Sequence, residues 1–231
     1  MIRSRADSSE VHRATVDRLV ANALPVTRLW PVRRQLALWC TLSGALLAGS
    51  SASQLRADLA QRVTDPTYVA SAVLLLSAAI VTAMLAFRAA EPGREARHRE
   101  SLGAILLVTG ALLLTLAAPP SHDPVGSLFS ANAARCLSTA VTLAALPLVT
   151  LLLALGRGAP VRAALAGAQA GAAAFLVAAF QLHLLCPLDD RLHLLALHFA
   201  PIGLASLVSS GLCGAWFRRR AAARGRQMLA G

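Results

Sequence analysis

The sequence has little charge, few aromatic side chains and no lysine. Charged residues make up 14% and aromatic residues 4% of the 231 residues, and all 22 basic residues are arginine. A soluble domain has roughly a quarter of its residues charged, so this composition excludes an ordinary soluble domain. Apolar residues instead make up 56% of the chain, with a mean hydropathy of +0.60. The sequence therefore indicates an integral membrane protein.

The apolar residues form six blocks without acidic or arginine residues, separated by short charged connectors. Each block is long enough for a helix to cross the ~30 Å hydrocarbon core of a bilayer. The blocks span residues 36–55, 68–87, 102–118, 137–155, 163–185 and 194–217. The absence of acidic residues from them counts against an ion-coupled transporter. We predict an all-α, polytopic membrane protein with six transmembrane helices.

The arginines are distributed unevenly between alternate connectors. Eighteen of the 22 lie in the N-terminal tail, the second and fourth connectors and the C-terminal tail. Because cytoplasmic loops carry the excess of basic residues, both termini are predicted to be cytoplasmic (N-in/C-in). The chain then divides into a cytoplasmic tail (1–35), a transmembrane bundle (36–217) and a basic cytoplasmic tail (218–231). The arginines are expected to meet membrane lipid headgroups, and no direct contact with nucleic acid is predicted.

Residues 8–26 of the tail, SSEVHRATVDRLVANALPV, predict an amphipathic helix that ends at Pro25. Its apolar side chains recur at mixed three- and four-residue spacing, opposite a face that carries Arg13, Asp17 and Arg18. An apolar stripe outside the membrane must bury against something. The lipid surface, the underside of the bundle and a protein partner all fit this pattern.

Gly167 and Gly171 lie four residues apart in the fifth block. Small residues at this spacing let helices approach closely in lipid. We expect these glycines to contact another helix of the same chain.

The predicted topology sorts the four cysteines into two pairs. Cys40 and Cys213 lie near cytoplasmic helix ends, whereas Cys136 and Cys186 lie at the outer ends of the fourth and fifth helices. Disulfides persist at that outer face, and a bridge would need Cα atoms within ~7 Å. Two inert buried thiols are the alternative.

The stretch QLHLLCPLDDRLHLLALHF (181–199) gathers histidines, a cysteine and two carboxylates, Asp189 and Asp190, in an apolar context. Its H-x2-C-x6-H-x4-H spacing matches no structural zinc pattern. His193 and His198 are five residues apart, which would place them on different sides of an α-helix. We therefore predict no permanent metal, no cofactor and no enzymatic centre. Transient capture of a soft metal or an oxidant is expected instead, with candidate residues Cys136, Cys186, His183 and His193.

Seven short segments occur in an order and spacing that together are specific. They are DRLVANALPV (17–26), RLWPVRRQLALW (28–39), RADLAQRVTDPTYV (56–69), FRAAEPGR (87–94), RCL (135–137), GAPVRAALAG (158–167) and HLLCPLDDRLHLLALH (183–198). In these segments the chain resembles the NrsF-like family, six-helix inner-membrane anti-sigma factors that regulate extracytoplasmic-function sigma factors. The similarity covers nearly the whole chain.

The resemblance implies a non-enzymatic regulator in the bacterial inner membrane whose cytoplasmic tail holds an extracytoplasmic-function sigma factor inactive. It also implies that Cys136 and Cys186 take part in sensing metal or oxidative stress. The candidate partner-binding residues of the tail are Asp17, Leu19, Val20 and Leu24. Cys40 and Cys213 have no counterpart and are expected to be structural.

Two alternatives remain at this stage. A small multi-pass transporter or metal-efflux component would use the histidines and cysteines as an entry site, and its activity would persist without the tail. A membrane redox enzyme is disfavoured because the chain has no C-x-x-C motif. The histidine-rich segment after Cys186 departs from the family pattern and leaves the inducing signal open.

Overall fold

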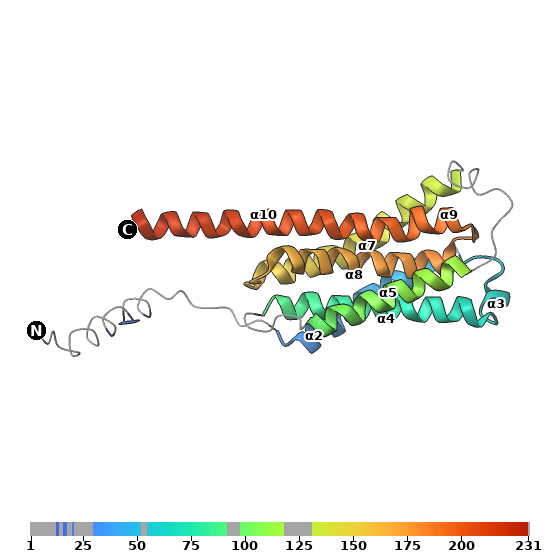
Figure 1. Cartoon of the computed structure of the whole chain (residues 1–231), viewed down its shortest axis with the longest axis horizontal. Helices are drawn as coiled ribbons and strands as arrows, with labels where there is room; N and C mark the ends of the chain where they lie inside the picture. The colour runs from blue at the N-terminus through green and yellow to red at the C-terminus, as the bar shows by residue number, and fades with distance from the viewer. Residues whose placement is uncertain are drawn as a thin grey trace, which may run out of the picture.

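The computed structural model describes residues 30–51, 55–91, 98–117 and 131–230, together with Arg13, Val16, Asp17 and Val20. Every regular element in that part of the chain is a helix (Figure 1). The elements are α2 (Val32–Ser51), α3 (Leu59–Arg62), α4 (Pro66–Ala89), α5 (His98–Ala117), α7 (Ala131–Arg157), α8 (Ala163–Leu185), α9 (Arg191–His193), the π-helix η1 (Leu194–Phe199) and α10 (Ala200–Ala230). The all-α prediction is confirmed for the described residues.

Five helical segments of the described chain are long and apolar enough to cross a membrane. They are α4, α5, α7, α8 and the continuous run formed by α9, η1 and α10, and they correspond to the second to sixth predicted blocks. The first block is represented by α2, a helix of 20 residues. Whether α2 forms a sixth span, and the N-in/C-in orientation, remain predictions.

Local sequence signals account for where α4 begins. Asp65 precedes α4, and its side chain accepts a hydrogen bond from the Thr67 backbone amide at 2.8 Å. Pro66 occupies the first helical position, where its missing N–H leaves no intrahelical bond unmade. The cap and the proline together start α4 at the first residue after the loop.

Helix α8 packs against α4, α7 and α10, and eight of its 13 buried residues are alanine or glycine. At Gly167 an added Cβ would lie 2.4 Å from the Ser209 carbonyl oxygen of α10, and at Gly171 it would lie 2.4 Å from the Ala205 carbonyl oxygen. The two backbones therefore approach closely at both glycines. This confirms the prediction that they serve packing within the chain.

Two polar side chains, Trp39 and Gln181, hydrogen-bond helix α2 to other helices. The indole Nε1 of buried Trp39 donates to the Pro147 carbonyl oxygen of α7 at 3.1 Å. The Gln181 side chain of α8 donates to the Leu47 carbonyl oxygen at 3.3 Å and to Ser50 Oγ at 3.1 Å. In an apolar bundle such interhelical hydrogen bonds fix one helix against another.

The bundle has two different ends. Helix α2 begins and α10 finishes at one end, and α10 extends past the other described helices there (Figure 1). The opposite end carries α3, α9 and the short segment between α8 and α9. Cys136, at the start of α7, and Cys186, at the end of α8, lie at this second end, which is called the loop end below.

Candidate functional site

Four metal-ligating side chains meet at the loop end of the bundle. Cys136, Cys186, His193 and His198 each offer a ligand atom, and these atoms all lie within 4.8 Å of one another. All four residues are buried, and His193 is fully buried. Their positions differ along the chain: the second turn of α7, the residue that ends α8, the end of α9 and the interior of η1. We call this group the Cys/His cluster.

The π-helix explains how His198 enters the cluster. In an α-helix, residues five apart differ by roughly 140° in direction, whereas a π-helix joins residue i to residue i+5. Residues Leu194–Phe199 adopt the π form, and the His193 and His198 rings meet edge to face with centroids 5.7 Å apart. The expectation that these histidines lie on different sides of a helix is therefore wrong.

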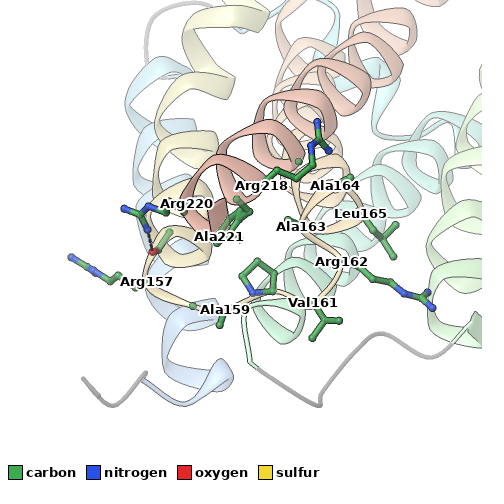
Figure 2. Close-up of a pocket in the computed structure, with 15 residues that line it drawn as sticks. Arg157, Ala159, Val161, Arg162, Ala163, Ala164, Leu165, Arg218, Arg220 and Ala221 are labelled. Atoms are coloured by element: carbon green, nitrogen blue, oxygen red, sulfur yellow. Dashed lines mark hydrogen bonds between the residues drawn. The ribbon is translucent and has the colours of Figure 1, made fainter. Parts of the chain in front are cut away.

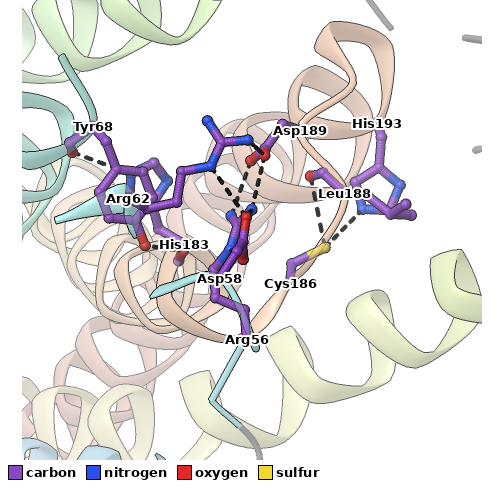
Figure 3. A network of polar contacts seen from close by, with 9 residues as sticks. All are labelled: Arg56, Asp58, Arg62, Tyr68, His183, Cys186, Leu188, Asp189 and His193. Carbon is purple, nitrogen blue, oxygen red and sulfur yellow. Dashed lines mark hydrogen bonds and ion pairs between the residues drawn. The ribbon is translucent and has the colours of Figure 1, made fainter. Parts of the chain in front are cut away.

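The two thiols of the cluster are in direct contact. Cys136 Sγ donates to Cys186 Sγ at 3.2 Å, and Cys186 Sγ lies 3.4 Å from His193 Nε2. In Figure 3, dashed lines join the Cys186 sulfur to the His193 ring and to the Leu188 carbonyl oxygen. Both thiols are reduced in this structure. The sequence-based pairing of these cysteines thus corresponds to a real contact between α7 and the end of α8.

Its surroundings make the Cys186 thiol more acidic than an ordinary cysteine thiol. The hydrogen bond from Cys136 has the largest effect and lowers the pKa of Cys186. Burial acts in the opposite direction, and the contacts with His193 and His198 lower the pKa further, so that it lies below its ordinary value. A lowered thiol pKa raises the fraction of thiolate, which is the species that attacks oxidants and binds metals. The cluster is therefore chemically suited to either reaction.

The two aspartates next to Cys186 are used for other contacts. Asp190 caps α9, where its carboxylate accepts from the His193 backbone amide at 3.0 Å. This cap fixes the backbone that presents His193 to the thiols. Asp189 points to a different group of residues and forms ion pairs with Arg56 and Arg62. Neither carboxylate belongs to the Cys/His cluster.

Arg56, Asp58, Arg62 and Asp189 form an ion-pair network beside the cluster (Figure 3). The Arg56 side chain is only 2% exposed and makes paired hydrogen bonds to Asp58, at 2.6 and 2.9 Å, and to Asp189, at 3.0 and 2.8 Å. The hydrogen bonds to Asp189 are the main reason that the pKa of Arg56 lies above its usual range, and Arg56 holds the pKa of Asp58 below its usual range. We call this group the Arg56 network.

The Arg56 network was not predicted from the sequence. The only available signal was a pair of arginines in a connector that is otherwise poor in basic residues. Its partner Asp189 lies 133 positions away in the chain, so no local pattern joins them. The network ties the segment before α4 to the segment that follows Cys186.

His183 lies apart from the Cys/His cluster. Its ring stacks on Tyr68 with centroids 4.2 Å apart, and its Nε2 lies 2.9 Å from Ser71 Oγ. The Tyr68 hydroxyl donates to the His183 carbonyl oxygen at 2.6 Å. The structure therefore brings together three of the four residues proposed for transient metal or oxidant capture and adds His198 to them. His183 belongs instead to the contact between α4 and α8.

The remaining sequence-predicted residues lie elsewhere. Asp17 and Val20 are helical and exposed, together with Arg13 and Val16, whereas Leu19 and Leu24 lie outside the described residues. Cys213 is buried in the close contact between α8 and α10, beside Gly167. Cys40 is partly buried on α2 against the main apolar core.

A basic pocket lies at the other end of the bundle, between the α7–α8 turn and α10 (Figure 2). Its volume is 730 Å³, and its lining includes Arg157, Arg162, Arg218 and Arg220. Arg220 donates to the Gly156 carbonyl oxygen at 3.2 Å and covers the Trp216 ring at 3.9 Å. Four of the arginines expected to meet lipid headgroups therefore lie together at this end.

These features define a helical bundle with several membrane-length helices and a buried Cys/His cluster at one end. Residues 19–221 match the NrsF family, described as negative regulator of sigma F, and the chain belongs to this family. It is accordingly a negative regulator of a sigma factor. No curated protein and no solved structure matches the chain.

Proposed function

We propose that this protein is an inner-membrane anti-sigma factor whose N-terminal tail sequesters an extracytoplasmic-function sigma factor in the cytoplasm. Oxidants or soft metals that reach the thiols of Cys136 and Cys186 at the outer face cause its release. The family match supports the regulatory role. The observation that carries the sensing role is the contact between the Cys136 and Cys186 thiols, 3.2 Å apart at the loop end.

A short route connects the thiols to the tail. Cys186 ends α8, and five residues earlier Gln181 bonds to Leu47 and Ser50 of α2. Helix α2 follows the N-terminal tail in the chain. A change in the packing of α7 against α8 would therefore be transmitted through Gln181 to the helix that carries the tail.

Oxidation supplies one such change. Hydrogen peroxide converts the two thiols to a disulfide and is itself reduced to two molecules of water. The sulfur atoms then move from 3.2 Å to a bonded separation of about 2.0 Å. The start of α7 is drawn toward the end of α8 as a result.

The tail is tested with a reporter for sigma-dependent transcription, co-expressed with the extracytoplasmic-function sigma factors of the source genome. The full chain should repress one of them, and a chain that lacks residues 1–35 but still inserts in the membrane should not. Val20→Asp should also abolish repression, because Val20 is 68% exposed and a charge there disrupts an apolar contact. Val20→Ile is the matched control and should repress normally. Repression that survives loss of the tail would refute the anti-sigma mechanism.

The thiols are tested in the same reporter strain under peroxide and cadmium. Cys136→Ser and Cys186→Ser should repress as the wild type does but should not respond to either stress. Cys40→Ser and Cys213→Ser are the matched controls, because these cysteines lie outside the cluster, and they should respond normally. A full response without both cluster cysteines would remove the sensing role and leave the tail result untouched.

A further inference from the structure

We infer that Cys136, Cys186, His193 and His198 form one four-coordinate site for a thiophilic divalent cation of the Zn²⁺ and Cd²⁺ class. The physiological role of this site rests on the proposed sensing function. Its existence as a binding site does not, because it follows from the geometry and chemistry of the four side chains.

The spacing of the donor atoms fits a tetrahedral ion. With Zn–S bonds of about 2.3 Å and Zn–N bonds of about 2.0 Å, neighbouring ligand atoms are about 3.3–3.8 Å apart. The two sulfur atoms are 3.2 Å apart, Cys186 Sγ is 3.4 Å from His193 Nε2, and all four donor atoms fall within 4.8 Å. Side-chain adjustments of a few tenths of an ångström to about 1 Å would close the site.

The donor set selects the class of ion. Two thiolates and two imidazoles in a tetrahedral arrangement are typical of zinc, and thiolates favour soft cations over magnesium or calcium. Binding exchanges two thiol protons, which leave to water, for one dication. The resulting unit of one M²⁺ and two thiolates carries no net charge, which is the condition for burial in an apolar bundle.

A second observation points to a ligand at this place. His198 Nε2 is buried and has no hydrogen-bond partner among the described residues. A buried polar atom without a partner is uncommon and costly. The π-helix that carries His198 is itself a rare conformation that often marks functional positions. Coordination of an ion would explain why the chain brings this ring into the cluster.

The site would add a coordination bond network between elements that already pack through apolar side chains around the cluster. Cys136 belongs to α7, whereas Cys186, His193 and His198 belong to the segment from the end of α8 to η1. An ion bound to all four residues would clamp the start of α7 to this segment. Bound thiolates are also unavailable to form the disulfide, so metal and oxidant would compete for the same two sulfur atoms.

The inference is tested on the purified, reduced full chain in detergent micelles, titrated with Co²⁺ and then with Zn²⁺. One Co²⁺ should bind per chain and give thiolate charge-transfer bands with the strong visible bands of tetrahedral cobalt, and Zn²⁺ should displace it. His198→Gln should weaken binding at least roughly 10-fold, since even loss of a group behind the ligands costs 10- to 100-fold. His183→Gln is the matched control and should bind as the wild type does, because His183 lies outside the cluster.

Zinc X-ray absorption of the wild-type chain tests the ligand set without any substitution. Two sulfur and two nitrogen ligands are expected. A site with sulfur and water ligands only, unchanged affinity in both His193→Gln and His198→Gln, or no binding at all would overturn the inference. The reporter assay of the tail, run without added metal, tests the proposed function separately, so the two can fail independently.

Discussion

Arg56 is the residue whose side chain does most to organise the loop end. Its buried guanidinium contacts two carboxylates in paired fashion, and only arginine has the planar fork that can do this. We predict that Arg56→Lys lowers the midpoint of thermal unfolding in detergent, because lysine cannot make both pairs of hydrogen bonds. Arg62→Lys is the control and should have a smaller effect, since the Arg62 side chain is 37% exposed. Equal effects of the two substitutions would contradict this account.

Asp58 gives the Arg56 network a dependence on pH. Its pKa is lowered from the ordinary value of 3.8, chiefly by the hydrogen bond with Arg56. A carboxylate with a lowered pKa stabilises the folded chain above its ordinary pKa and loses that contribution as the pH falls toward the folded value. The midpoint temperature of thermal unfolding should therefore fall more steeply below about pH 4 for the wild type than for Asp58→Asn. Parallel pH profiles of the two proteins would show that Asp58 is not linked to folding.

The sequence was sufficient to pair Cys136 with Cys186 but not to identify all four residues of the Cys/His cluster. The cysteine pairing followed from the alternation of apolar blocks and connectors, which placed both residues at helix ends on the same predicted side of the membrane. His198 was set aside because spacing rules for an α-helix do not apply to the π-helix of Leu194–Phe199. Arg56 was missed because its partner is distant in the sequence, and charge patterns report on near neighbours only.

The close contact between helices α8 and α10 depends on the glycines of α8. A Cβ at Gly171 would lie 2.4 Å from the Ala205 carbonyl oxygen, whereas at Gly203 of α10 it would meet nothing within 4 Å. We predict that Gly171→Ala destabilises the chain by about 1–3 kcal/mol through overpacking. Gly203→Ala is the matched control and should be neutral or stabilising, because alanine favours helix by about 1 kcal/mol. Unfolding of both variants in mixed micelles measures the difference.

The elements themselves were the most predictable part of the fold. Apolar length and uncharged composition place a membrane helix with little help from tertiary contacts, so α4, α5, α7, α8 and α10 correspond to predicted blocks. Apolar length and composition do not predict a π-helix inside a long helical run. The π-helix Leu194–Phe199 interrupts the last long helical run, and no residue type in LLALHF signals it.

The proposed function requires that chemistry at the loop end be coupled to the tail that precedes α2. Gln181 is the described side chain of α8 that hydrogen-bonds to α2, through Leu47 and Ser50. A relay of this kind works only if the two helices move as one body. We therefore predict that Gln181→Leu leaves the tail able to repress but reduces the transcriptional response to peroxide and cadmium.

A second glutamine on the same helix provides the control for this prediction. Gln169 is also buried on α8, but it lines a pocket among α4, α5 and α10 rather than contacting α2. Gln169→Leu removes the same polar group from the same helix and should preserve the response. Metal binding by both purified variants should equal that of the wild type, because neither residue belongs to the Cys/His cluster. If Gln181→Leu responds fully while still binding metal, the signal reaches the tail by another path, and the contacts of Trp39 with α7 become the next connection to break.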